Sequence, residues 1–222
     1  QGNIGQANIA GGTHNLVNNG RISADVAGGT LTVVPGAGSG GVFNKALMDA
    51  RGGIALGRRE LGQYLFAEMK VDAWWSATIN CEYEIARNQL EKDGKARGYT
   101  VCATKTIKAD ANACYAPFAS AKEMDRWFGP GHSLDLGDGG KLSNADGNRA
   151  TVKKANPGKT IRLIWEDADL IMPTPVEIKF APSGAKTTVM VTIDRLQTRA
   201  EADGYRRAWG DALDRLKALV EG

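Results

Sequence analysis

The residues best suited to acid–base chemistry are four carboxylates that follow or interrupt apolar runs of the chain. A carboxyl group can act as a general acid or base when a dry pocket shifts its pKa toward neutrality. The alternation of the runs places Glu166 and Glu177 on the face opposite the apolar side chains. The sequence therefore favours solvent-facing carboxylates over catalytic ones. The four residues are Glu166, Asp167, Asp169 and Glu177.

A second candidate is the Gly-rich segment Gly36-Ala-Gly-Ser-Gly-Gly41, which has the GxGxxG spacing of dinucleotide-binding loops. Such a loop follows a strand directly and is paired with an acidic residue about 20 residues later. Here Pro35 interrupts the junction, and Glu60, which has the right offset, lies in a helical pattern. A flexible Gly-rich linker is the favoured interpretation. Gly158-Lys-Thr160 lacks the leading glycine of a phosphate-binding loop and is interpreted as a turn.

Histidine and cysteine offer little for metal binding or nucleophilic catalysis. The two histidines, His14 and His132, are far apart, and Cys81, Cys102 and Cys114 show no CxxC spacing. We therefore expect no metal site, no cofactor and no nucleophile–base pair. His132, beside a Gly-Pro-Gly turn, is expected to be exposed. An odd number of unpaired cysteines is typical of free, partly buried thiols in a reducing compartment, which predicts a cytoplasmic protein.

Charge and hydropathy exclude other classes. The 28 basic and 25 acidic residues are interspersed and leave a net charge of +3, without the clustered basic face that nucleic-acid binding favours. No apolar run approaches the roughly 18 residues needed to cross a membrane. Gln1 is not an initiator methionine, so we expect a processed or truncated chain.

Large aromatic and methionine side chains are the better candidates for a binding site. They could converge between a sheet and the C-terminal helix, either as a plain core or as the wall of a cavity. Small-molecule cavities are lined mainly by such groups together with a few polar ones. The candidate ligand-binding residues are Tyr115, Phe118, Trp127, Phe128, Trp165, Met172, Phe180, Met190, Tyr205 and Trp209.

These side chains must be positioned by the last half of the chain, which reads as a strand, two short helices, a meander of strands and a long helix. Residues 199–220 place apolar side chains at three- and four-residue steps, which predicts one amphipathic helix. Asp110 begins a short helix that runs to Phe118, and Ser120 caps a second one over 121–128. Alternation predicts strands at 99–107, 132–136, 141–143, 149–155, 160–166, 175–181 and 186–195.

The first half of the chain divides into two regions of different composition. Residues 1–42 form a Gly/Asn-rich extension, either β-like, with faint repeats similar to β-helix coils, or poorly ordered. Residues 43–95 are predicted to form a helical module, although a β-like echo competes with the helix at 42–56. Within it we expect Met69 on the apolar helix face and Glu84 in a solvated pair with Arg87. The stretch 92–98 is expected to be a polar linker.

Residues 99–222 resemble the START-like (SRPBCC, helix-grip) superfamily, and within it the bacterial homologues of the chaperone-ATPase activator. The resemblance lies in four segments of this sequence. They are Lys105-Thr-Ile-Lys-Ala-Asp110, Met124-Asp-Arg-Trp-Phe-Gly-Pro130, Pro157-Gly-Lys-Thr-Ile-Arg-Leu-Ile-Trp165, and the helix that contains Tyr205, Trp209, Leu213, Leu216 and Leu219.

Residues 47–104 resemble a small helical domain of unknown function that often precedes such domains in bacteria. This likeness departs from the family pattern at Asn88, where a glycine is expected. It rests on Leu47-Met-Asp-Ala-Arg-Gly52, Gly57-Arg-Arg-Glu-Leu61, Trp74-Trp75 and Tyr83-Glu84.

The resemblance implies an α+β helix-grip fold, an antiparallel curved sheet wrapped around a long C-terminal helix. The expected domains are 1–42, 43–95 and 97–222. It also implies a cavity between sheet and helix that holds a small hydrophobic or amphipathic molecule. A co-chaperone-like module that binds a protein partner is the alternative, and a cyclase- or hydrolase-type enzyme is a further one. A binding protein without catalysis is favoured.

Overall fold

In the computed structural model, the residues described are 16–18, 42–44 and 52–222. The chain forms two compact units, residues 1–87 and 88–222, and each is considered by itself. The GxGxxG segment and the predicted helical residues 46–51 lie outside the described residues. Within the part that is described, no helix is long and apolar enough to cross a membrane.

A parallel pair of short strands belongs to the first unit. Strand β1 (Leu16–Asn18) pairs with β2 (Val42–Asn44), so that Leu16 faces Val42 and Asn18 faces Asn44. At residues 42–44 the β-like alternative is therefore correct, and the favoured helix is wrong. The two segments have the same residue types in step, which suits them to pair in register.

The helices of the first unit are η1 (Gly53–Ala55), α2 (Gly57–Gln63), the π-helical η2 (Tyr64–Glu68) and α3 (Ala73–Ala86). Leu61, Leu65 and Tyr83 form their buried core. Met69 was expected on this face, but its side chain is 46% exposed. The reason is the π turn, which widens the helix and rotates the residues after it away from the apolar side.

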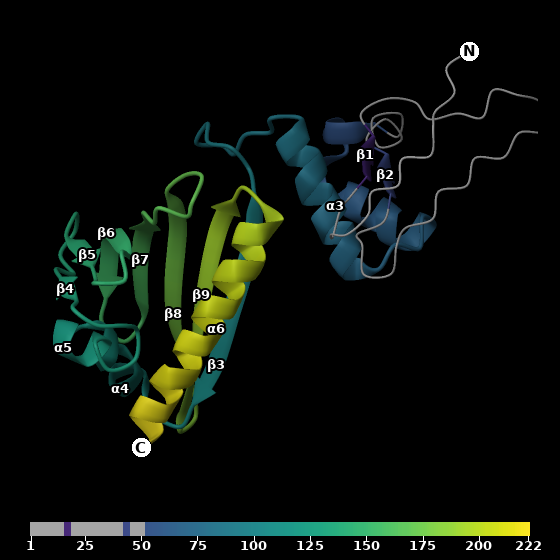
Figure 1. The fold of residues 1–222 in the computed structure, drawn as a ribbon. Helices are drawn as coiled ribbons and strands as arrows, with labels where there is room; N and C mark the ends of the chain where they lie inside the picture. The colour runs from purple at the N-terminus through teal and green to yellow at the C-terminus, as the bar shows by residue number, and fades with distance from the viewer. Residues whose placement is uncertain (1–15, 19–41, 45–51) are drawn as a thin grey trace, which may run out of the picture. The chain divides into compact units, whose positions relative to one another are not determined.

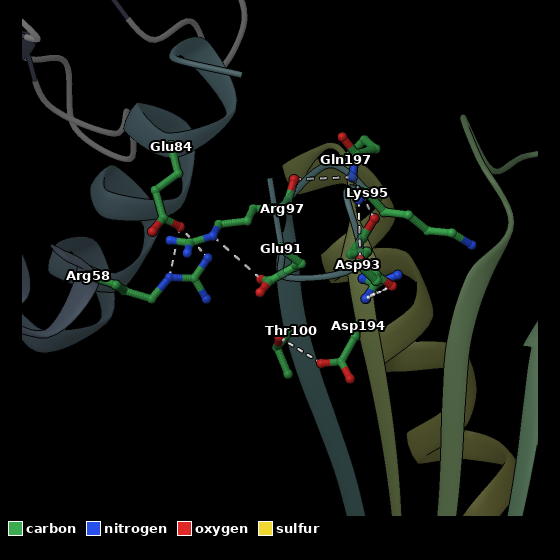
Figure 2. A network of polar contacts seen from close by, with 10 residues as sticks. Arg58, Glu84, Glu91, Asp93, Lys95, Arg97, Thr100, Asp194 and Gln197 are labelled. Carbon is green, nitrogen blue, oxygen red and sulfur yellow. Dashed lines mark hydrogen bonds and ion pairs between the residues drawn. The ribbon is translucent and has the colours of Figure 1, made fainter. Parts of the chain in front are cut away.

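Glu84 is buried rather than solvated, because its carboxylate pairs with Arg58 from α2 (Figure 2). Removing a carboxylate from water is costly unless a charged partner and hydrogen bonds compensate. Helical spacing alone pointed to Arg87, whereas this partner is 26 residues away in the chain.

The second unit contains a seven-stranded antiparallel sheet in the order β3-β9-β8-β7-β6-β5-β4, with a long helix on one face (Figure 1). This is the predicted helix-grip fold, and the strands agree with the predicted runs to within a few residues. Their bounds are β3 (Tyr99–Ile107), β4 (Ser133–Leu134), β5 (Lys141–Ser143), β6 (Arg149–Asn156), β7 (Thr160–Trp165), β8 (Thr174–Ser183) and β9 (Lys186–Leu196).

The inner face of the sheet is apolar, as the alternation predicts. In β7, Ile161, Leu163 and Trp165 are buried, and Val189 and Val191 are buried in β9. Burying a side chain of this size contributes about 1.5–3 kcal/mol to folding, so this face carries much of the stability of the unit.

Two short helices connect β3 to β4, and both start where they were predicted to start. Asp110 accepts a hydrogen bond from the Ala113 amide over 2.8 Å and begins α4 (Ala111–Tyr115), which continues as η3 (Ala116–Phe118). Ser120 caps α5 (Ala121–Met124). Helix α5 therefore ends four residues before the predicted Phe128, and a turn replaces its last part.

Helix α6 (Arg199–Glu221) closes the fold. Thr198 caps it, and Glu201 accepts hydrogen bonds from the Gln197 and Thr198 amides, which forms a capping box. Its predicted stripe is confirmed in the middle of the helix, where Trp209, Ala212, Leu213 and Leu216 are buried.

The predicted linker 92–98 is instead the tip and return of a small hairpin. Residues 89–97 fold back on themselves and are held to the junction between β9 and α6 (Figure 2). Arg195 Nη2 lies 2.7 Å from Asp93 Oδ2, and Gln197 Nε2 donates to the Arg97 carbonyl. Gly98 follows, where a Cβ would lie 2.4 Å from the Leu196 carbonyl oxygen. Only glycine permits this approach.

Candidate functional site

An aromatic cluster lies between the sheet and the middle of α6. The ring centroids of Trp165 and Trp209 are 5.6 Å apart, and Phe128 lies 5.8 Å from Trp165 and 5.0 Å from Trp209. Helix α6 supplies Trp209, β7 supplies Trp165, and the turn after α5 supplies Phe128. These edge-on and tilted contacts are the geometries that aromatic rings prefer.

The other predicted aromatics form a neighbouring group. Tyr115 and Phe118 each pack edge-on against Phe180, with centroids 5.5 Å and 5.3 Å away, and Trp127 lies 4.7 Å from Phe118. The structure therefore brings all the predicted aromatic residues except Tyr205 together in one core.

The two predicted methionines do not join this core. Met190 lies on the opposite face of the sheet, because its neighbours Val189 and Val191 point inward. It stands beside Thr104 and Lys179 and does not line the interior. Met172 is half-buried in the loop between β7 and β8.

The cavity inside this core is small. It measures about 10 Å³ and is lined only by apolar and aromatic side chains, among them Phe128, Trp165 and Trp209. Drug-sized ligands occupy cavities of about 300–1,000 Å³. The aromatic residues therefore fill the space that the family resemblance assigned to a ligand.

Polar residues lie just outside the ends of four strands of the sheet. Register across the strands aligns Leu142, Ala150 and Trp165. Two residues beyond these positions along the chain stand Asn144, Asn148 and Asp167. These three residues lie just outside β5, β6 and β7, and Asn148 and Asp167 lie near each other. His132 lies directly before β4, two positions from Leu134. We call these four residues the polar row.

His132 was expected to be exposed, but its side chain is completely buried. Its Nδ1 lies 2.8 Å from Asp125 Oδ1, which also accepts a hydrogen bond from the His132 amide. These two bonds hold the pKa of the Asp125 carboxyl below its usual value. Because an ionised carboxylate can only accept, the imidazole proton is on Nδ1. Its Nε2 is buried and has no hydrogen-bond partner among the described residues.

Helix α6 meets the polar row through Tyr205. Its hydroxyl donates to Asp167 Oδ2 over 2.8 Å. Burial raises the pKa of the Tyr205 phenol well above its ordinary value, and the hydrogen bond to Asp167 raises it further. The phenol therefore stays protonated and acts as a donor at neutral pH.

An open groove of about 530 Å³ lies between the first half of α6 and the loop of residues 166–173. We call it the α6 groove. Figure 1 shows this β7–β8 loop at the end of the sheet where α6 begins. The Ile171 amide donates to Glu201 Oε1 over 2.8 Å, which ties the loop to the helix. The lining residues are Asn148, Asp167, Asp169, Ile171, Thr198, Ala200, Glu201, Gly204, Tyr205 and Ala208.

Sequence reasoning named only Tyr205 of this lining as a ligand contact. Asp167 and Asp169 were considered for acid–base chemistry, and here Asp167 is held by the Tyr205 hydroxyl and the Asp169 amide. Among the described residues, no group of three histidine, cysteine or acidic side chains could hold a metal ion. All three cysteines are free thiols, as expected, with Cys81 and Cys114 buried.

The fold and this arrangement define a START-like protein of the helix-grip class. Residues 108–221, just over half of the chain, match the sequence model of the family described as Activator of Hsp90 ATPase homolog 1-like protein. The chain belongs to that family. No curated protein matches it in a sequence search.

Solved structures support the same fold. The solution structure of CalU16 from Micromonospora echinospora is 17% identical, with a TM-score of 0.52, over 60% of this chain and 71% of that one. An HSP90 activator from Plasmodium falciparum is 16% identical, with a TM-score of 0.51, over 55% and 96%. The Aha1 dimer from Colwellia psychrerythraea is 19% identical, with a TM-score of 0.50, over 55% and 96%.

Proposed function

We propose that the unit of residues 88–222 binds a small amphipathic molecule in the α6 groove. The observation that carries this proposal is the size and lining of the groove. Its volume of about 530 Å³ lies within the usual range of small-molecule sites. The lining combines apolar and polar groups, as such sites do.

The apolar side of the α6 groove suits a hydrocarbon or ring. Ile171 is 67% exposed there, so a ligand that covers it removes apolar surface from water. Across from it, Ala200, Gly204 and Ala208 recur every four residues along α6. They therefore share one stripe of the helix, and their small size leaves room for a ligand.

The polar side can orient the ligand. Asp169 and the Asn148 side chain border the α6 groove, and the Tyr205 hydroxyl lies next to Asp167. A molecule with a polar end and an apolar end can satisfy both sides at once.

Two glycines of α6 provide a matched test. A Cβ at Gly204 or at Gly210 would meet no atom within 4 Å, so a side chain can begin at either position without a clash. Only Gly204 lines the α6 groove. With Nile red as the fluorescent probe, we expect Gly204→Leu to weaken binding at least tenfold and Gly210→Leu to bind like the wild type. Equal binding by all three proteins, or none by the wild type, would contradict the proposal.

A second candidate is a co-chaperone-like module, which the family description and the filled interior favour. On this hypothesis the exposed Ile171 contacts a protein partner. Stimulation of ATP hydrolysis by a purified Hsp90, lost on Ile171→Asp, would support it, with Leu90→Asp, another exposed apolar position, as the control. The cyclase- or hydrolase-type alternative gains nothing from the interior cavity, whose described lining includes no carboxylate.

A further inference from the structure

The lining of the α6 groove carries acidic side chains and no basic ones. Asp167, Asp169 and Glu201 line it, and none of its described lining residues is a lysine, an arginine or a histidine. All three carboxylates lie close enough to Tyr205 to act on one phenol. Burial raises the pKa of this phenol most, the hydrogen bond to Asp167 raises it further, and the charges of Asp167, Asp169 and Glu201 add to the effect.

The basic residues in the first half of α6 do not neutralise this charge. Arg199 Nε is bound to Asp203 Oδ2, 2.8 Å away and one turn along the helix. Arg206 and Arg207 directly follow Tyr205 in the chain, but both are exposed and neither belongs to the lining of the groove. The groove therefore has an excess of negative charge.

Glu201 is the carboxylate least available to a ligand. Its Oε1 accepts a hydrogen bond from the Ile171 amide, and its Oε2 accepts one from the Gln197 amide over 2.6 Å and one from the Thr198 amide over 3.2 Å. It also lies in the first turn of α6, where the positive end of the helix dipole offsets a negative charge. The protein itself thus balances Glu201.

Asp167 and Asp169 are balanced less well. The two oxygens of Asp167 accept hydrogen bonds from uncharged donors, the Tyr205 hydroxyl and the Asp169 amide. Asp169 is exposed, and no hydrogen bond or ion pair of its carboxylate is observed among the described residues. Two unit charges of opposite sign attract each other more strongly near a protein surface than in bulk water. A positive group that enters the groove is therefore favoured beside these two carboxylates.

The groove suits an organic cation better than a metal ion. Among the described residues, no group of three histidine, cysteine or acidic side chains could hold a metal. The volume of about 530 Å³ and the exposed Ile171 instead provide room and apolar contact for a hydrocarbon or a ring. Both requirements are met by a molecule that joins an ammonium group to an apolar part.

We propose that the α6 groove selects amphipathic cations, with the ammonium group beside Asp167 and Asp169 and the apolar part over Ile171. This inference rests on the proposed function, because it concerns the same groove. It adds the charge of the ligand and names the two residues that select it.

Dansylcadaverine and its N-acetyl derivative test the proposal, because they share one fluorophore and one chain. Only the free amine is charged at pH 7, since an alkylamine, like lysine, keeps its proton there. In fluorescence titrations we expect the wild type to bind the amine at least about tenfold more tightly than the acetylated dye, because two carboxylates attract it. Added salt should lower this ratio by screening the charges.

Two isosteric variants show where the preference arises. Asp169→Asn removes one negative charge from the groove and should reduce the ratio of the two affinities at least about threefold. Asp211→Asn removes the same charge from an exposed position of α6 outside the groove, and it should keep the wild-type ratio. Equal affinities of the two dyes in the wild type, or a ratio that Asp169→Asn leaves unchanged, would overturn the proposal.

The Gly204→Leu variant separates this inference from the proposed function. If it weakens Nile red binding while the wild type binds the two dyes equally, the groove is a binding site and the selection of cations is wrong. If it leaves the binding of Nile red and of both dyes unchanged, the groove itself is wrong, and the inference fails with it.

Discussion

The hydroxyl of Tyr205 donates a hydrogen bond to Asp167 Oδ2 over 2.8 Å, which joins α6 to the loop after β7. Four residues along the helix, Trp209 meets Trp165, which lies two residues before Asp167. Four helical residues rise about 6 Å and two strand residues about 6.6 Å. The distance between Tyr205 and Trp209 along α6 therefore matches the distance between Asp167 and Trp165 along the other chain segment. The polar contact and the aromatic contact can form together for this reason.

Tyr205→Phe should lower the free energy of unfolding by about 1–3 kcal/mol, because it removes a hydrogen bond to a carboxylate from a half-buried position. Urea denaturation measures the change. Tyr115→Phe is the matched control, since its ring is also packed but no hydrogen bond of its hydroxyl is observed among the described residues. Equal losses in the two variants would argue against the contact.

Alkaline pH should destabilise the wild type more than Tyr205→Phe. The pKa of Tyr205 is raised in the folded protein, mainly by burial and then by Asp167. Above the ordinary tyrosine value of about 10, the unfolded chain loses this proton while the native state keeps it, so stability falls as pH rises. Urea unfolding between pH 8 and 11 should show a difference between the two proteins that shrinks with pH. A constant difference would contradict the shift.

Thr198→Ala should cost about 0.5–2 kcal/mol of stability, because it removes the N-cap of α6. Thr198→Ser retains the capping oxygen and should restore most of the lost stability.

Glu201→Ala should speed hydrogen exchange at the Ile171 amide, since Glu201 Oε1 accepts the hydrogen bond of this amide. Unchanged exchange at Ile171 would show that the loop is held by other contacts.

The stability of the protein should depend on pH in the acid range because of the ion pairs of Glu177. Its carboxylate bonds Lys179 Nζ and Arg162 Nε, each 2.8 Å away, and Lys179, followed by Arg162, lowers its pKa below the ordinary 4.5. The resulting stability is present above that value and is lost as pH falls through the folded pKa. Glu177→Gln should therefore cost up to about 1 kcal/mol at pH 7. The cost should shrink as the pH falls below 4.5 in thermal unfolding, and a cost independent of pH would contradict the ion pairs.

Trp209→Ala should cost about 3–5 kcal/mol, the usual range for removing a large aromatic side chain from a core. Trp209 is only 4% exposed and packs on Phe128 and Trp165. Arg206→Ala, on the exposed side of α6, should change stability by less than about 0.5 kcal/mol. Denaturant unfolding compares the two. Similar losses of stability in the two variants would mean that Trp209 does not contribute to the core.

Several features followed from the sequence alone. Alternation identified every strand of the large sheet and placed Trp165 inward and Glu177 outward, as observed. The opening of α4 was predicted at Asp110, and the hydroxyl of Ser120 identified the start of α5, because capping depends on residues only three positions apart. Each of these signals is local, so each can be read before the chain folds.

Tertiary structure decided the rest. It buried His132 and Glu84, which looked solvated, because their partners Asp125 and Arg58 come from other elements. Met190 is different: it lies on the outer face because it alternates with the buried Val189 and Val191, so the strand period in the sequence already excluded it from the interior. Tertiary structure also filled the interior with Phe128 and left the open volume beside α6. Periodicity shows which side of an element is apolar, but only the packed neighbours determine whether that side meets a ring, a cavity or solvent.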